Sequence, residues 1–223
     1  MKEDDIEHRF REIYLDHSWS GVSRSGPGSE PQKAAIYLNT LQGLIREPDR
    51  AIHSVVDIGC GDWSLSKGIE WENISYTGID IVPELIEDLN ERYGSDRIRF
   101  VHANIVKDDL PVGDLAIVKD VLQHLSNESV LAFLKKLPKY RFVLITNDCR
   151  RYRRMRWPFC WIKLHQRPNV DTYDGGSRPL RLNERPFFLP ATELASWDMQ
   201  LGQSSYTKQT LLWERSEKLK KNL

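Results

Sequence analysis

The residues in this sequence that could do chemistry are acids, glycines and a histidine placed where apolar runs end. The first run, residues 54–58, carries Asp57 and leads into Gly59 and Gly61. Two glycines at this spacing let the backbone turn sharply and come within contact distance of a ligand. A dinucleotide-binding loop would need a third glycine, and Asp57 and Asp62 favour a ligand with a positive group. A nucleotide-like ligand is therefore the first hypothesis.

Asp80 stands near the end of the second apolar run, residues 76–81, about twenty residues past the glycine turn. In α/β nucleotide-binding folds, a carboxylate at this position holds a ribose diol. The alternative for Asp80 is an aspartate that only caps a turn. A third run over residues 98–103 follows.

Polar residues stand at the ends of a fourth and a fifth apolar run, residues 114–119 and 141–146: Lys119 ends the fourth run, Asp120 and His124 follow it, and Asp148 follows the fifth. Ligands of open parallel sheets bind outside the carboxyl ends of the strands, where these side chains would lie. His124 is the side chain best suited to take a proton near neutral pH, although a lone histidine more often packs or caps a helix. Asp120 and Asp148 are the other candidates for catalysis.

The elements that position these residues alternate between strands and helices, which indicates a doubly wound sheet. Two more strands, over residues 194–199 and 209–214, are expected as an antiparallel pair at the sheet edge. We therefore expect an α/β, Rossmann-like fold, a three-layer α/β/α sandwich with a seven-stranded, mostly parallel sheet.

The stretch from Ile52 to Asp148 resembles the class I S-adenosylmethionine-dependent methyltransferases, and a small bacterial-type group among them whose substrates are unknown. The resemblance rests on the acid-x-Gly-x-Gly turn at residues 57–61 and on the five strands with acids at the ends of the first and second. It implies methyl transfer from S-adenosylmethionine. It also implies a cofactor site made of Asp57, Gly59, Cys60 and Gly61 at the methionine part, Asp80 at the ribose, Ile81 and Asn104 at the adenine, and Asp120.

Asn104 departs from the family pattern, because members commonly have an acid there that accepts a hydrogen bond from the adenine amino group. The carbonyl oxygen of the Asn104 side chain is expected to do the same.

The chain divides by composition into four parts. Residues 1–50 are expected to form N-terminal helices and a lid loop, with Arg24 available to a carboxylate or phosphate. Residues 51–148 form the S-adenosylmethionine-binding core, and residues 149–190 a basic and aromatic insertion on the substrate side. Residues 191–223 supply the last strand pair and a tail.

The insertion is the most basic part of a chain whose formal net charge is zero. From Cys149 to Pro186 ten Lys or Arg residues face three acids, which indicates a local anionic contact. Its prolines argue against a helix, so we expect it to lie over the strand ends. Arg178, Arg181 and Arg185 are the candidate substrate ligands there. The cluster from Arg150 to Arg156 is a solvated face, an anion clamp, or a surface for a membrane or nucleic acid.

Composition narrows the function class. No apolar run approaches the roughly 20 residues of a membrane span, the first residues are not a signal peptide, and a cytoplasmic protein is expected. The three cysteines lack Cys-x-x-Cys spacing, so neither a disulfide framework nor a metal site is indicated.

The expected reaction is methyl transfer to an oxygen or nitrogen nucleophile of a small anionic or sugar-like acceptor. The alternatives are methylation of a macromolecule, RNA or a protein side chain, and a binding protein that senses a nucleotide without chemistry. A nucleic-acid reader would ordinarily be more basic overall.

Overall fold

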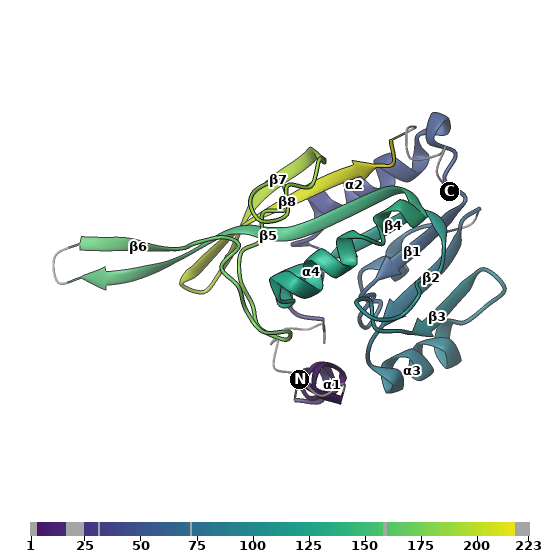
Figure 1. Cartoon of the computed structure of the whole chain (residues 1–223), viewed down its shortest axis with the longest axis horizontal. Coiled ribbons are helices and arrows are strands. Elements are labelled where there is room, and N and C mark those ends of the chain that lie inside the picture. The colour runs from purple at the N-terminus through teal and green to yellow at the C-terminus, as the bar shows by residue number, and fades with distance from the viewer. Residues whose placement is uncertain (1–3, 17–24, 31, 72, 158–159, 217–223) are drawn as a thin grey trace.

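The computed structural model describes residues 4–16, 25–30, 32–71, 73–157 and 160–216, and it places a mixed sheet at the centre of the chain (Figure 1). Its strands are β1 Ser54–Ile58, β2 Ser75–Asp80, β3 Ile98–His102, β4 Gly113–Lys119, β5 Tyr140–Trp157, β7 Thr192–Leu201 and β8 Ser204–Glu214, in the order β3-β2-β1-β4-β5-β8-β7. The first five are parallel to one another, and β8 is antiparallel to both β5 and β7. The expected seven-stranded, mostly parallel sheet is confirmed.

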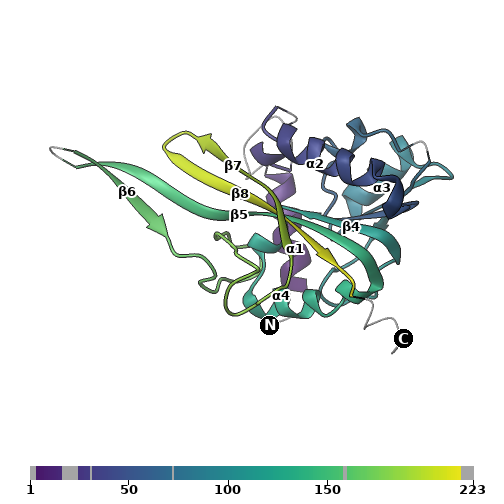
Figure 2. The same cartoon turned by 90° about the horizontal axis from the view of Figure 1, so that it is seen from above.

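Each face of the sheet is covered, so the core has two halves. Helices α2 (Ala35–Arg46) and α3 (Pro83–Tyr93) cover one face, and α4 (Asn127–Leu134) with residues 178–191 covers the other (Figure 2). Successive residues of a strand point to opposite faces, and Val55 accordingly packs in the first half and Val56 in the second. This is the three-layer arrangement that the alternating strands and helices predict.

Helix α1 (Asp4–Leu15) lies apart from these layers, near the carboxyl ends of the strands. The Arg9 guanidinium donates a hydrogen bond to the carbonyl oxygen of Asp174 at 3.0 Å, and Arg11 pairs with Glu84. Two segments distant in sequence therefore fix the helix over the carboxyl ends of the strands.

Short 3-10 helices occupy Pro27–Ser29, Pro48–Arg50, Ser66–Gly68, Leu122–His124 and Leu137–Lys139.

The basic segment departs from the expectation that it lies over the strand ends. β5 continues to Trp157 and pairs with an additional antiparallel strand, β6 (Cys160–Gln166), forming a ribbon that projects from the body of the molecule (Figures 1 and 2). Prolines interrupt strands as well as helices, but none lies within residues 140–157 or 160–166. Only the later part, residues 167–191, returns to the sheet.

Candidate functional site

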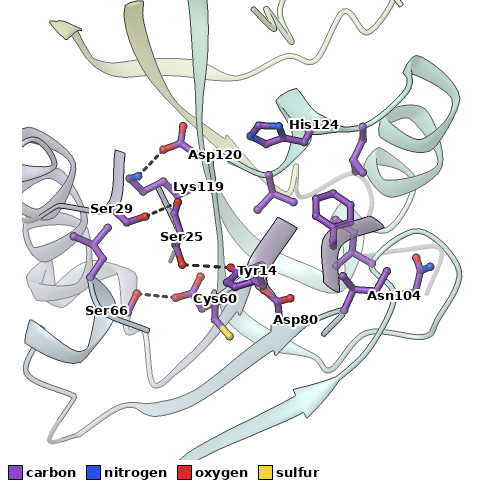
Figure 3. Close-up of a pocket in the computed structure, with 18 of the residues that line it drawn as sticks. Tyr14, Ser25, Ser29, Cys60, Ser66, Asp80, Asn104, Lys119, Asp120 and His124 are labelled. Carbon is purple, nitrogen blue, oxygen red and sulfur yellow. Dashed lines mark hydrogen bonds and ion pairs between the residues drawn. The ribbon is translucent and has the colours of Figure 1, made fainter. Parts of the chain in front are cut away.

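A cavity of about 930 Å³, counting the adjoining space open to solvent, lies at the carboxyl ends of β1, β2 and β4. It brings together most of the residues that the sequence predicts for the cofactor: Asp57, Gly59, Cys60, Asp80, Ile81, Asn104 and Asp120, with His124 beside them (Figure 3). Gly61 does not line it, but the Gly61 amide donates to the Asp80 carboxylate at 3.0 Å. Residues far apart in sequence thus form one hollow at the sheet edge.

The two glycines of the turn after β1 sit where a side chain would not fit. Gly59 has φ +75°, and a Cβ there would come within 2.3 Å of a Val121 methyl carbon. Gly61 has φ +56°, and its Cβ would meet the Ser25 hydroxyl at 2.1 Å. Glycine adopts positive φ without a steric cost. The turn therefore needs glycine at both positions to bring its backbone to the cavity.

Asp57 is buried at the cavity wall. Its Oδ2 accepts hydrogen bonds from the Tyr76 hydroxyl at 2.6 Å and the Ser66 hydroxyl at 2.7 Å. Burial raises the pKa of Asp57, and these two hydrogen bonds oppose that rise. The carboxylate is thereby fixed in orientation beside the glycine turn.

Asp80 ends β2 with its carboxylate in the same cavity. The backbone amides of Gly61 and Val82 donate to its two oxygens at 3.0 and 3.2 Å. Burial raises the pKa of Asp80 to about 6, although these backbone hydrogen bonds lower it. The carboxylate retains acceptor capacity, because each oxygen can accept more than one hydrogen bond.

Asn104 lines the cavity, but its carbonyl oxygen is already engaged. The backbone amides of Val106 and Lys107 donate to Asn104 Oδ1 at 2.9 and 3.2 Å. An amide oxygen has two lone pairs, so both are used in holding the turn after β3. The adenine contact expected through this atom finds no support in the geometry.

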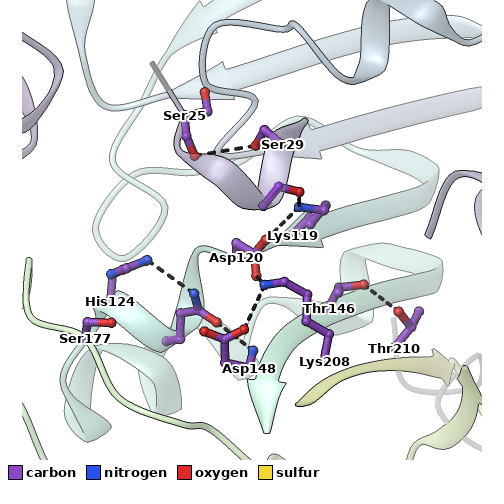
Figure 4. Close-up of polar contacts among 12 residues, drawn as sticks. Ser25, Ser29, Lys119, Asp120, His124, Thr146, Asp148, Ser177, Lys208 and Thr210 are labelled. Carbon is purple, nitrogen blue, oxygen red and sulfur yellow. Dashed lines mark hydrogen bonds and ion pairs between the residues drawn. The ribbon is translucent and has the colours of Figure 1, made fainter. Parts of the chain in front are cut away.

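Four buried or half-buried charges form a chain at the cavity: Lys119 ends β4, Asp120 follows it, Asp148 is on β5 and Lys208 is on β8 (Figure 4). Lys208 Nζ lies 2.6 Å from Asp120 Oδ1 and 2.8 Å from Asp148 Oδ1, and Lys119 Nζ lies 2.6 Å from Asp120 Oδ2. Burial alone would raise the pKa of Asp120, but the two ammonium groups hold it well below its usual range. Asp120 therefore stays ionised near neutral pH and is a poor proton acceptor.

The network includes one residue that the sequence did not single out, Lys208. Burial lowers the pKa of this ammonium group, and the carboxylates of Asp120 and Asp148 more than offset that effect, so its pKa is raised. A lysine is almost never fully buried unless it is paired, so Lys208, just before the strand expected over residues 209–214, would be read from the sequence as a solvent-facing residue. Its burial follows from the pairing of β8 with β5, which brings Lys208 opposite Asp148.

His124 is held in one orientation. Its Nδ1 lies 2.8 Å from the carbonyl oxygen of Gly176, and since a carbonyl only accepts, Nδ1 carries the proton. Burial lowers the pKa of His124, opposed by this hydrogen bond and by the charges of Asp120 and Asp148. The imidazole is consequently neutral near pH 7, with Nε2 as its acceptor nitrogen, 3.4 Å from the Gln123 amide nitrogen.

A second cavity, of about 670 Å³ including space open to solvent, adjoins the first. The two share Ser25, Asp120 and His124. Asp148 and Lys208 line only the second. Of the three candidate proton acceptors, Asp120 and His124 therefore lie where the two cavities meet, and Asp148 lies in the second cavity.

Of the expected substrate arginines, the three that the structure describes line neither cavity. Arg178 is almost fully buried, and it donates to the carbonyl oxygen of Leu125 at 2.7 Å and to the Asn127 side chain at 2.5 Å. Arg181 donates to the Cys149 carbonyl at 3.1 Å and pairs with Glu184. Arg185 is exposed, and Arg24 lies outside the described residues.

The cavity also has walls that the sequence did not assign to it. Ile6, Phe10 and Tyr14 of α1 line it, together with Ser25. The Ser25 hydroxyl donates to Asp62 at 3.0 Å, which fixes the approach to the glycine turn. The helical spacing of the three α1 residues was the available signal, since it predicts one apolar face that must be buried.

No helix in the part of the chain that the structure describes is long and apolar enough to cross a membrane.

Comparison with known proteins agrees with this geometry. Residues 55–140 match the model of a methyltransferase domain family, whereas a search of curated proteins found no match.

Solved structures with the same fold cover most of the chain. An S-adenosylmethionine-dependent methyltransferase from Leishmania major superposes with a TM-score of 0.64 at 12% identity, over 93% of this chain and 82% of that one. Coclaurine N-methyltransferase, bound to N-methylheliamine and S-adenosylhomocysteine, gives 0.59 at 13% identity over 95% and 82%. N-methyltransferase NodS from Bradyrhizobium japonicum, with S-adenosylhomocysteine, gives 0.55 at 15% identity over 90% and 98%. The family match and the fold agree: residues 55–140 match a methyltransferase domain, and the chain as a whole has the fold of the class I S-adenosylmethionine-dependent methyltransferases.

Proposed function

We propose that this methyltransferase holds S-adenosylmethionine in the first cavity and methylates an oxygen or nitrogen nucleophile of a small polar acceptor in the second. The observation that carries the proposal is that the two cavities meet at His124, Asp120 and Ser25. Two substrates of a group transfer must meet with their reacting atoms in line, and orientation of this kind contributes roughly 7 to 11 kcal/mol to catalysis.

The residues of the first cavity fit the cofactor. Asp80 offers a carboxylate to the ribose hydroxyls, and the glycine turn with Asp57 offers a close backbone and a negative charge to the methionine end. Apolar side chains from Ile81, Ile105 and Leu125 line the remainder, where an adenine ring would pack. Only glycine fits at Gly59, which supports a role in close approach to a ligand.

When bound, S-adenosylmethionine supplies a methyl group on a sulfonium sulfur; the nucleophile's electron pair forms the new bond to the methyl carbon, and the carbon–sulfur pair stays on sulfur. This chain's part is to orient the acceptor and take its proton. His124 Nε2 is the acceptor for that proton, because its Nδ1 is already protonated by virtue of the Gly176 contact. Asp120 stays ionised between two lysines and supplies charge rather than proton transfer.

Calorimetric titration with S-adenosylmethionine and S-adenosylhomocysteine tests the cofactor assignment, with NAD as the control ligand. We expect micromolar binding of both, absent for NAD, and a loss of at least tenfold in affinity for Asp80→Ala, on the order of one or two hydrogen bonds to a charged group. Unchanged affinity in Asp80→Ala would show that the Asp80 carboxylate does not bind the ribose.

His124→Gln tests the proton acceptor. We expect the affinity for S-adenosylhomocysteine to stay within twofold while turnover falls on the order of 10² to 10⁴ fold, the usual contribution of a general base. In the wild type, kcat should fall as pH drops below the lowered pKa of His124, and the variant should lose this acid limb. If the variant keeps wild-type turnover, solvent and not His124 accepts the proton of the nucleophile.

A further inference from the structure

The second cavity is walled by the elements that project beyond the ordinary sheet. Arg151 comes from the extension of β5, and Met199, Leu201 and Tyr206 come from the ends of β7 and β8. Ser177 closes it from the segment that returns to the sheet. The core supplies the rest of the lining, including Asp120, His124 and Asp148. The cavity is therefore where the extension could select the acceptor.

The charged side chains that line this cavity are the carboxylates of Asp120 and Asp148 and the cations of Lys208 and Arg151, with His124 neutral beside them. Lys208 is fully engaged, because its Nζ lies 2.6 Å from Asp120 and 2.8 Å from Asp148. Arg151 lies farther from its carboxylate, at 3.3 Å from Asp148. Arg151 is therefore the cation of this cavity that can attract a ligand's negative charge.

Arg151 is the cation with donors to spare. Its Nη2 donates to the Ser177 hydroxyl at 2.9 Å and lies 3.3 Å from Asp148 Oδ2, longer than an ordinary charge-assisted hydrogen bond. Its Nε is buried and has no hydrogen-bond partner among the residues that the structure describes. The guanidinium also lies 4.9 Å over the Tyr206 ring, which holds its plane. Such a fixed, planar fork suits a carboxylate, which it can bind through two parallel hydrogen bonds.

The remaining wall is apolar. Met199 and Leu201 stand two residues apart on β7 and therefore share one face, and Leu201 is 37% exposed beside the charged part of the cavity. Tyr206 adds an aromatic ring to the same wall. An acceptor that covers these side chains needs an apolar portion.

We infer that the acceptor is a small carboxylic acid, with its carboxylate on Arg151 and Ser177, an apolar middle part against Met199, Leu201 and Tyr206, and its hydroxyl or amine nucleophile at His124. This inference rests on the proposed function, because it places the acceptor across the junction from the cofactor. It names the chemistry that selects the acceptor, a carboxylate at one end and a nucleophile at the other.

The test uses hydroxy- and amino-substituted benzoic acids and medium-chain hydroxy and amino acids, each paired with its uncharged carboxamide. Binding to protein loaded with S-adenosylhomocysteine is measured by calorimetry, and methyl transfer with radiolabelled S-adenosylmethionine. We expect at least one acid to be methylated, with kcat/KM at least tenfold above that of its amide. Arg151→Gln should bring this ratio close to one and raise the KM of the acid at least tenfold, while Arg151→Lys keeps part of the preference.

Arg150→Gln is the matched control, since it removes the same charge from the adjacent exposed residue, which lines neither cavity. It should leave the preference for the acid unchanged. Ser177→Ala, at an exposed position, should lower kcat/KM for the acid severalfold and covers the case in which Arg151→Gln does not fold.

Equal use of acids and amides, an undiminished preference in Arg151→Gln, or no binding of any acid to protein that binds S-adenosylhomocysteine normally would each overturn the inference. Failure to bind S-adenosylhomocysteine at all would instead overturn the proposed function, so the two failures are distinguishable.

Discussion

Asp80 connects cofactor binding to pH, because burial raises its pKa to about 6. Above that pH the carboxylate is ionised and accepts hydrogen bonds from ribose hydroxyls, and below it the bound proton removes that capacity. We therefore expect affinity for S-adenosylhomocysteine to fall about tenfold between pH 7 and pH 5, since a group with a pKa of about 6 is roughly one-tenth ionised at pH 5. Calorimetry at the two pH values measures it.

Asp80→Asn is the control for this pH dependence. It preserves the size of the side chain and cannot ionise, so its weaker affinity should change little between the same pH values. If the variant retains the full tenfold fall, another buried acid causes the pH dependence. Asp57 is then the first candidate, because burial also raises its pKa.

Among single residues, the sequence revealed the positions that depend on local geometry. Gly59 and Gly61 are recognisable because a sharp turn at a strand end requires glycine, and Asp80 because it ends the next strand. The Asn104 contacts are local as well, because its side-chain oxygen bonds the backbone amides two and three residues on, in the turn that follows. Lys208 is different, because it is buried by a strand pairing that joins residues 60 positions apart, which no local pattern encodes.

At the scale of elements, Arg178 holds the segment after β6 against the start of α4. Its guanidinium reaches the Leu125 carbonyl and the Asn127 side chain, and the residue is 1% exposed. We expect Arg178→Met to lower the free energy of unfolding by about 2 to 4 kcal/mol, because buried acceptors lose a charged donor. Urea denaturation followed by circular dichroism measures the change.

Arg185→Met is the comparison, since Arg185 is exposed and should change the unfolding free energy by less than about 0.5 kcal/mol. The KM of the acceptor should not respond to Arg178→Met in any folded preparation. Wild-type stability combined with a raised KM would restore Arg178 to the substrate site that the sequence suggested for it.

The sequence predicted the parallel core because its apolar runs are short, regular and separated by helical patterns, so strand and helix are distinguished by period alone. It did not predict that β5 would run on to Trp157. Residues 150–156 are mostly arginines, and a run of like charges carries no apolar alternation. Such a strand exists because β6 and β8 supply pairing partners, a long-range condition that no window of sequence contains.

At the scale of the whole molecule, deleting the projecting ribbon distinguishes a small acceptor from a macromolecular one. Beyond Arg153 the β5 strand pairs only with β6, since its pairing with β8 stops at Arg153 and Ser204. A two-stranded ribbon adds little stability. Replacing residues 154–163 by Asn-Gly closes the hairpin at Arg153 and Leu164 with a favoured two-residue turn. We expect the shortened protein to melt within a few degrees of the wild type and to bind S-adenosylhomocysteine equally.

The shortened protein should also methylate a small acid with kcat/KM within about threefold of the wild type, because Arg151, Ser177 and Tyr206 all remain. If RNA or another polyanion is the acceptor, the ribbon's arginines and lysine would bind its phosphates. Activity of the full chain would then fall steeply with salt, because each neutralised phosphate releases counterions, and the deletion would abolish it. Steady activity on small acids between 50 and 200 mM salt, in both proteins, is the outcome that the two adjoining cavities predict.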